Sequence, residues 1–326
     1  MKALVCKQWG PIEQLQIEVL EEPQPGPGQA VVTVHAASVN FPDALIVQGQ
    51  YQVKPPLPFS PGAELAGVVK SVGTGVTHVK PGDRVMAFPG YGGFAQACCV
   101  DAAKLMRLPD DLDFELGASF MLTYGTSLHG LRTIGKLRAG ETVLVLGAAG
   151  GVGLAAIEIS RALGARVIAG ASSEERLALC RKLGAEYTIN YSTEDLRAQI
   201  DTFTEKQGVD VVYDPIGGKL AETALRATAW RGRYLVVGFA AGEIPKIPLN
   251  LALLRERAIL GVFWGDAMRR DPALLQADLK TLWEWFREGK VHPVISERVG
   301  LDGAANAIAR LARREIMGKV VVFPQQ

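Results

Sequence analysis

The sequence lacks the features that mark a nucleic-acid-binding, membrane-spanning or disulfide-stabilised protein. Its net charge is only +1 and no block of like charges occurs, so neither nucleic acid nor an anionic membrane is an expected partner. The four cysteines form no Cys-x-x-Cys pair, and a reduced, cytoplasmic protein is the simplest interpretation. The N-terminus has no apolar segment of the signal-peptide type. One nearly apolar run, residues 142–159, contains four glycines and Glu158, which favours a buried strand, turn and helix over a lipid span.

The pattern of residues 1–110 is typical of a β-rich domain. Short β-prone runs at residues 30–34, 67–72 and 84–88 are separated by proline and glycine clusters such as residues 23–28 and 80–83. Strands at this spacing, with turn signals between them, predict a barrel or sandwich-like domain.

The central part of the chain alternates between strands and helices. A mostly helical segment, residues 116–137 with Gly125 as a candidate break, leads into this part. The predicted strands are residues 142–146, 166–169, 187–190, 209–213 and 233–237, with helices over 152–163 and after Ser172 or Ser173 to 183. Helices are also expected at 272–288 and 304–313, with a last strand at 319–323. This alternation predicts an α/β fold with a doubly wound parallel sheet.

The strongest motif is the turn after the first of these strands. The sequence Ala148-Ala149-Gly150-Gly151-Val152-Gly153 is a GxGxxG pattern with alanine in the first glycine position. Gly150 allows a pyrophosphate to approach the backbone, Gly153 allows the helix to pack near the strand, and the helix N-terminus offers free N–H groups. We therefore predict dinucleotide contacts from Ala149, Gly150, Gly151, Val152 and Gly153. A tight turn without a ligand is the alternative.

The end of the second central strand favours NADPH over NADH. NAD-binding proteins usually place an acid there for the ribose 2′-hydroxyl, whereas residues 167–173 contain none. Ser172 and Ser173 accommodate a 2′-phosphate, and Arg176 is one helical turn further on, where its guanidinium can reach that phosphate. Tyr191, after the third strand, is predicted to close the same pocket. For Arg176 the alternative is an ordinary solvated helix charge.

Motifs throughout the chain resemble the quinone oxidoreductase and zeta-crystallin family of medium-chain dehydrogenases/reductases. They include residues 38–43 and 49–51, the run Pro58–Gly67, residues 82–85 and the glycine turn. The resemblance implies a GroES-like β-rich catalytic domain, residues 1–122 plus 258–326, with an inserted doubly wound Rossmann domain, residues 123–257, that binds NADP. It also implies a homodimer in which a Rossmann edge strand, here residues 258–262, pairs across a two-fold axis.

The same superfamily contains zinc alcohol dehydrogenases, and the resemblance shows where their metal ligands would be. The cysteine position falls within residues 37–40, which contain no cysteine, and the histidine position is Ala63. The four closely spaced cysteines of the structural zinc lobe are also absent. Since zinc needs three or four N, S or O ligands, no metal is predicted, and a zinc alcohol dehydrogenase is the disfavoured reading.

The resemblance also implies the remaining site residues. Asn40, Asp43 and Tyr51 are the predicted catalytic residues, in a cleft between the domains. Asn40 would hydrogen-bond a carbonyl or the nicotinamide amide, Asp43 would organise loop and cofactor contacts, and Tyr51 would orient or protonate the substrate, or else pack on the nicotinamide or cap a loop. The other predicted cofactor contacts are Thr123, Thr126, Gly217, Gly218, Val237, Gly238, Phe239, Ala240, Val262, Phe263 and Trp264. Helix packing is the alternative for the threonines, and core packing for Phe263 and Trp264.

A hydride donor that works without a metal suits acceptors that are already electron-poor. We therefore expect an NADPH-dependent reductase of a small electrophilic acceptor, either a quinone or an activated C=C bond of an enone. An enoyl-thioester reductase of the acryloyl-CoA type and an NADPH-binding protein with little turnover remain alternatives.

Overall fold

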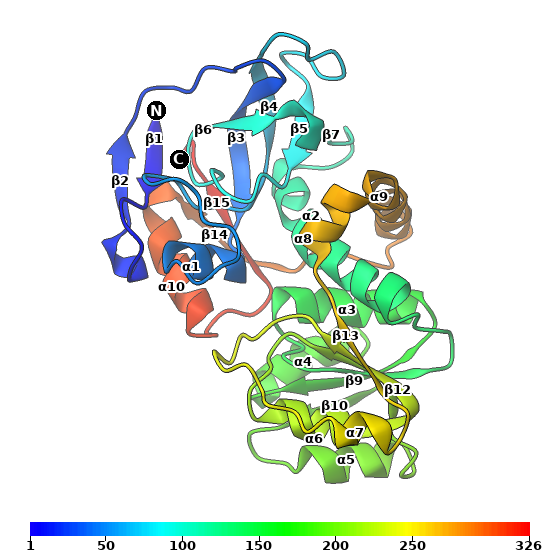
Figure 1. The fold of residues 1–326 in the computed structure, drawn as a ribbon. Helices are drawn as coiled ribbons and strands as arrows, with labels where there is room; N and C mark the ends of the chain where they lie inside the picture. The colour runs from blue at the N-terminus through cyan, green and yellow to red at the C-terminus, as the bar shows by residue number, and fades with distance from the viewer. The chain divides into compact units, whose positions relative to one another are not determined.

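The structure, a computed structural model, describes residues 1–326 and divides the chain into two compact units. Unit 1 comprises residues 1–122 and 295–326, and unit 2 comprises residues 123–294. Figure 1 shows the blue N-terminal and red C-terminal segments within unit 1, and the green and yellow segments within unit 2.

Unit 1 is built around a seven-stranded sheet. Its strands are β3 (Gln29–Ser38), β4 (Glu64–Val72), β5 (Arg84–Ala87), β6 (Ala97–Asp101), β7 (Leu105–Arg107), β14 (Ile295–Gly300) and β15 (Lys319–Phe323). The order along the sheet is β14-β15-β3-β4-β5-β7, and β6 also pairs with β3. A separate hairpin is formed by β1 (Lys2–Val5) and β2 (Gln16–Val19). The β-rich N-terminal prediction is confirmed, with β3 and β4 longer than the apolar runs that indicated them.

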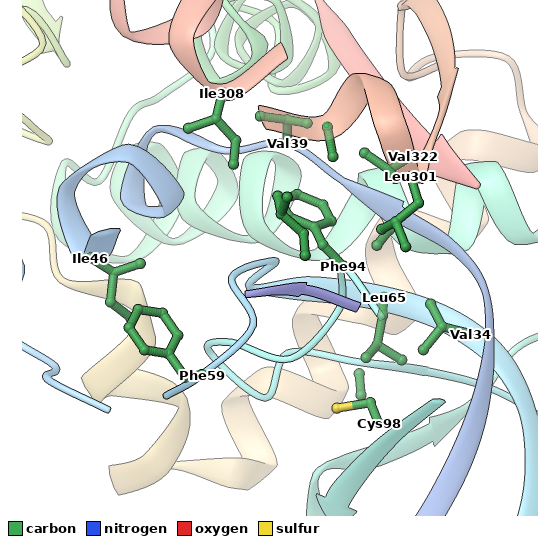
Figure 2. Packing of buried hydrophobic residues seen from close by; sticks show 14 of the residues in the cluster. Val34, Val39, Ile46, Phe59, Leu65, Phe94, Cys98, Leu301, Ile308 and Val322 are labelled. Carbon is green, nitrogen blue, oxygen red and sulfur yellow. The ribbon is translucent and has the colours of Figure 1, made fainter. Parts of the chain in front are cut away.

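The last strand completes the N-terminal sheet. β15 pairs antiparallel with β3, so that Val321 lies opposite Ser38. Side chains from both chain ends share one core, in which Val34 and Leu65 pack with Leu301, Ile308 and Val322 (Figure 2). Unit 1 therefore needs residues that precede unit 2 in the sequence and residues that follow it to bury its apolar surface.

Short helices complete unit 1. They are α1 (Phe41–Val47), α10 (Ala304–Ala312) and the 3₁₀ turns η1 (Ile12–Gln14), η2 (Ala102–Lys104) and η4 (Leu301–Gly303). Helix α2 (Phe114–Leu128) begins in this unit and continues into unit 2.

Unit 2 contains a six-stranded parallel sheet. The strands are β8 (Thr142–Val145), β9 (Arg166–Ala171), β10 (Tyr187–Asn190), β11 (Val209–Asp214), β12 (Thr228–Val236) and β13 (Ala258–Gly261). Their order is β10-β9-β8-β11-β12-β13. All four residues of β8 are buried, as expected for a parallel strand covered on both faces. The doubly wound prediction is confirmed, and the order reverses between β8 and β11, where ligands of such sheets bind.

Helices complete unit 2 (Figure 1). They are α3 (Gly151–Ala162), α4 (Glu174–Lys182), α5 (Leu196–Phe203), α6 (Leu220–Arg226), α7 (Asn250–Leu253), α8 (Trp264–Arg270), α9 (Pro272–Arg287) and the π-helix η3 (His129–Ile134). None of the helices has the length and apolar composition that crossing a bilayer requires.

The structure contradicts the domain boundary that the sequence predicts after residue 257. β13 pairs in parallel register with β12, and α8 and α9 follow it within unit 2. Residues 258–294 therefore belong to the unit that contains the parallel sheet, to which β13 is joined by its pairing with β12.

Candidate functional site

The glycine turn of unit 2 joins β8 to the N-terminus of α3. Gly147 has a φ of 57°, and Gly150, in extended conformation, is the N-cap of α3. The first turn of the helix is formed by Gly151, Val152 and Gly153, whose N–H groups have no partner in the preceding turn. The helix thus presents N–H donors and the positive end of its dipole, as an anion-binding site requires.

Two glycines of this turn differ in what surrounds them. A Cβ atom on Gly153 would lie 2.5 Å from the carbonyl oxygen of Gly147, so close helix–strand packing requires glycine there. A Cβ atom on Gly150 would meet only that same oxygen, at 3.4 Å. Packing within the protein therefore explains Gly153 and leaves Gly150 for another role, which the close approach of a ligand supplies.

The neighbouring strand β9 ends without an acid. Ser172 is exposed, and the hydroxyl of Ser173, the N-cap of α4, accepts a hydrogen bond from the N–H of Arg176. Tyr191 donates its backbone N–H to the Ala171 carbonyl, and its ring lies against Gly170. The structure therefore gathers all four residues predicted for the 2′-phosphate, Ser172, Ser173, Arg176 and Tyr191, around the end of β9.

A buried acid, Asp214, shapes the loop after β11. One carboxylate oxygen accepts the N–H groups of Ile216 and Gly217 at 2.7 and 2.9 Å, and the other accepts the Tyr234 hydroxyl. Burial raises the pKa of this carboxyl despite these hydrogen bonds. The sequence analysis did not identify Asp214. Its signal was an acid that directly follows the run Val211–Tyr213 at the end of a strand and directly precedes Pro-Ile-Gly-Gly.

The loops after β11 and β12 lie against each other. Val237 and Gly238 both direct their N–H groups to the Asp214 carbonyl, and Ala240 bonds to Pro215. The ring of Phe239 packs on Gly217, which like Gly218 has a positive φ. Ile216 packs against Gly147. The predicted cofactor segments 217–218 and 237–240 are therefore brought beside the glycine turn.

The side chain of Trp264 packs in the core, which is the alternative to its predicted contact with the cofactor. Its side chain is 3% exposed, and a Cβ atom on Gly125 would lie 2.5 Å from its indole ring. Gly125 does not break α2, because it provides room for this ring. Val262 is likewise buried beside Gly130, whereas Phe263 is 53% exposed. Core packing thus explains the side chains of Val262 and Trp264, and the contact of residues 262–264 with the cofactor stays a prediction.

The two predicted threonines lie in the part of α2 that belongs to unit 2. Thr123 and Thr126 are both buried, and the neighbouring Ser127 hydroxyl donates to the Val152 carbonyl in the first turn of α3. This bond places that stretch of α2 beside the glycine turn.

In unit 1, Asp43 is fully buried and serves as an organiser. Its carboxylate accepts the N–H groups of Asn40, Gly62 and Ala63 at 2.7, 3.1 and 2.9 Å. Desolvation raises the pKa of Asp43 to about 7, although those N–H groups and Lys319 lower it. A carboxylate enclosed in this way organises the loops around it, as the resemblance implies, and is not exposed to a substrate.

Asn40 is also turned inward. Its Oδ1 accepts from the Lys319 ammonium at 2.5 Å, and its Nδ2 donates to the carbonyl and hydroxyl oxygens of Ser38. Asn40 is only 4% exposed to solvent. Both polar ends of the amide are thus occupied within unit 1, which contradicts the predicted hydrogen bond to a substrate carbonyl.

Glu64 and Lys319 were not identified from the sequence. Glu64 accepts from the Ser38 hydroxyl at 2.9 Å and the Leu122 N–H at 3.0 Å, and lies 3.9 Å from the Lys319 ammonium. Burial raises the pKa of Glu64 and lowers that of Lys319. Because Lys319 lies in the last strand, only the pairing of β15 with β3 reveals this cluster.

Tyr51 is the predicted catalytic residue that remains available. Its ring packs against the core of unit 1, and its hydroxyl has no hydrogen-bond partner within the protein. Burial and the charge of Asp43 raise the pKa of the phenol, so the hydroxyl keeps its proton at neutral pH. Tyr51 therefore offers a free hydrogen-bond donor.

Comparison with known proteins identifies both units. Residues 26–110 match the family described as alcohol dehydrogenase GroES-like domain, and residues 151–288 match the family described as zinc-binding dehydrogenase.

Relatives cover nearly the whole chain. Quinone oxidoreductase-like protein 2 of Bos taurus is 38% identical, over 93% of this chain and 88% of that protein. A quinone oxidoreductase of Pseudomonas aeruginosa is 36% identical over 99% of both chains. The crystal structure of Escherichia coli quinone oxidoreductase complexed with NADPH superposes with a TM-score of 0.93 at 28% identity, covering 99% of this chain and 100% of that one.

The residues of this chain do not fit the zinc ion that one family description names. Ala63 has no donor atom, the Asn40 amide is engaged with Lys319 and Ser38, and the Glu64 carboxylate is engaged with Ser38 and Leu122. No group of three His, Cys, Asp or Glu side chains is arranged to hold a metal. A buried ammonium, Lys319, already lies beside the carboxylate that a metal would need.

The two family matches and the full-length similarity agree with the observed pairing of a GroES-like unit with a parallel-sheet unit. The chain therefore belongs to the quinone oxidoreductase family of the medium-chain dehydrogenases/reductases.

Proposed function

We propose that this protein is an NADPH-dependent, metal-independent reductase of quinones or activated C=C bonds. The observation that carries the proposal is the arrangement at the carboxyl end of the parallel sheet of unit 2, where the open Gly150 turn lies beside a β9 end that has serines and Arg176 in place of an acid. The NADPH complex of the Escherichia coli relative supports the choice of cofactor.

Each loop of unit 2 has a part in holding the cofactor in this proposal. Residues 149–153 bind the pyrophosphate through backbone N–H groups, and Ser172, Ser173, Arg176 and Tyr191 receive the 2′-phosphate. The segments 217–218 and 237–240, held together by Asp214, border the ribose and nicotinamide, with Thr123 and Thr126 on α2. When bound, NADPH supplies the hydride.

Within this proposal, Tyr51 favours the reduction of a C=C bond. Reduction of an enone or enoyl thioester requires a proton at the α-carbon, and a half-buried, protonated phenol with a free hydroxyl is suited to orient the carbonyl or donate that proton. A quinone needs only protons on oxygen, which water provides readily.

An acceptor panel tests the proposal. Purified protein is mixed with NADPH and 9,10-phenanthrenequinone, 1,4-benzoquinone, simple enones or enoyl-CoA esters, and oxidation of NADPH is followed by absorbance. Turnover of quinones or of the unsaturated carbonyls supports the proposal and chooses between its two branches. Tight NADPH binding without turnover of any acceptor would instead favour a binding protein, and stoichiometric zinc in the active protein would contradict the metal-independent mechanism.

We also propose that the protein forms a homodimer through the free edge of β13. Leucines 249, 253 and 254, in and beside α7, are 78, 78 and 64% exposed, and Ile259 on β13 is 38% exposed. An edge strand with exposed leucines shortly before it in the chain suits isologous pairing with a second copy. The four unpaired cysteines support the predicted cytoplasmic location.

A further inference from the structure

The loop that carries Tyr51 is not fixed by backbone hydrogen bonds. In residues 51–58 no N–H or carbonyl group forms a hydrogen bond to the rest of the protein. Three of these residues, Pro55, Pro56 and Pro58, have no N–H group to donate. The position of Tyr51 is therefore set by the ends of the loop and by side-chain contacts.

Both ends of this loop, hereafter the Tyr51 loop, are fastened to one N-terminal segment, Cys6–Gly10. Before the loop, the Val47 carbonyl accepts the N–H of Gly10 at 3.1 Å. After the loop, Phe59 and Cys6 exchange two backbone hydrogen bonds of 2.8 and 3.1 Å. The segment 6–10 therefore spans the base of the loop.

Trp9, in the middle of that segment, contacts the loop on both sides of Tyr51. A Cβ atom on Gly49 would lie 3.1 Å from Cγ of the Trp9 ring, so the ring rests on the Gly49 backbone. The Lys54 ammonium lies over the same ring, 5.5 Å from its centroid. Gly49 has a φ of 69°, which makes it the point where the chain turns from α1 into the loop.

The exposure of Trp9 indicates that core packing is not its main role. The side chain is 44% exposed, which is unusual for the largest apolar ring unless it has a partner at the surface. Its contacts are with Gly49 and Lys54, which flank Tyr51 in sequence.

We infer that Trp9 is a positioning residue for the reaction, which fixes the Tyr51 loop so that the Tyr51 hydroxyl meets the acceptor. The inference rests on the proposed function, since it assigns Tyr51 to the acceptor side. Trp9 acts by contact with Gly49 and Lys54 and does not itself touch the acceptor.

Steady-state kinetics of Trp9 variants test this role. Trp9→Ala should lower kcat/KM for the acceptor about tenfold, because misplacement of an orienting group by an ångström is costly, while the Kd for NADPH stays unchanged. Trp9→Phe, which keeps a ring on Gly49, should restore most of the activity. Ile17→Ala, which removes a comparably exposed side chain of unit 1 from β2, is the matched control and should behave like the wild type.

A double-mutant cycle with Tyr51→Phe separates positioning from general destabilisation. If Trp9 acts through Tyr51, Trp9→Ala should cost little in the Tyr51→Phe background. Equal losses in both backgrounds, or a loss that Ile17→Ala reproduces, would overturn the inference.

A spectroscopic measurement distinguishes failure of this inference from failure of the proposed function. In protein labelled with 3-fluorotyrosine, the Tyr51 resonance is assigned by its absence in Tyr51→Phe. Trp9→Ala should shift or broaden that resonance even if no acceptor is turned over, and Trp9→Phe should leave it near its original position. An unchanged Tyr51 resonance in Trp9→Ala would refute the positioning role whatever the acceptor panel shows.

Discussion

A single buried lysine, Lys319, determines how the polar residues of unit 1 are used. An ammonium removed from water needs compensating partners. Lys319 donates a hydrogen bond to Asn40 and forms an ion pair with Glu64. The Asn40 amide is therefore directed inward, away from any substrate. The motif that suggested Asn40 as a ligand is retained here as part of a charge-balanced cluster, and Tyr51 is the residue that keeps a free polar group.

Arg176 provides a residue-scale prediction about cofactor choice. Arg176→Ala should raise the KM for NADPH about tenfold and leave that for NADH nearly unchanged, because a guanidinium–phosphate pair is a strong charge-assisted contact that only NADPH can make. Initial rates with both cofactors provide the measurement. Lys182→Ala, an exposed cation on the same helix, is the control, and equal effects on both cofactors would remove Arg176 from the phosphate site.

Glu158 provides a second residue-scale prediction, concerning stability and pH. This carboxyl is 6% exposed on α3, and accepts hydrogen bonds from the Tyr124 hydroxyl and the His292 N–H. Desolvation raises its pKa from 4.5 to about 7. Because the folded protein holds the proton more tightly than the unfolded chain, this stabilisation is complete below pH 4.5 and is lost as the pH rises through about 7.

Glu158→Gln should remove that part of the pH dependence. Between about pH 5 and about pH 8, the free energy of unfolding of the wild type should fall by about 1 to 3 kcal/mol more than that of the variant. Urea denaturation at the two pH values measures both. Glu175→Gln, at an exposed position of α4, should retain the wild-type dependence, and identical pH profiles for Glu158→Gln and wild type would contradict the assignment.

At the scale of elements, the βα turn combines a packing requirement with a binding requirement. Gly153 is needed for α3 to approach β8, whereas the space around Gly150 is open on the protein side. The two glycines of one motif therefore have separable functions. The GxGxxG pattern alone does not distinguish the glycine needed for packing from the glycine needed for binding.

Alanine substitutions should separate these functions. Gly150→Ala should leave the thermal midpoint nearly unchanged and weaken NADPH binding about tenfold or more, since the methyl group occupies the path of the pyrophosphate. Gly153→Ala should lower the midpoint as well, because its Cβ collides with the Gly147 carbonyl. Calorimetry of unfolding and of NADPH binding checks both, and unaltered NADPH affinity in Gly150→Ala would count against a cofactor at this turn.

At the scale of the whole molecule, the exposed leucines beside β13 predict the oligomeric state. Leu253→Glu should convert a dimer into a monomer, because burying a carboxylate in an apolar interface is costly. Light scattering after size-exclusion chromatography gives the mass. Val19→Glu changes an equally exposed side chain on β2, at 79% against 78%, and should remain dimeric; a wild-type monomer would refute the proposed edge pairing.

The parallel-sheet unit, the glycine turn and the acid-free end of β9 could all be predicted from the amino-acid sequence. These features depend on local patterns, namely apolar runs, helix caps and glycine spacing within a few residues, so they are visible without a third dimension. Three features required the folded structure: residues 258–294 belong to the unit of the parallel sheet, Trp264 packs on Gly125, and Lys319 contacts Asn40 and Glu64. Each of those depends on contacts between residues far apart in the chain, and a buried charge acquires its partners only when distant strands pair.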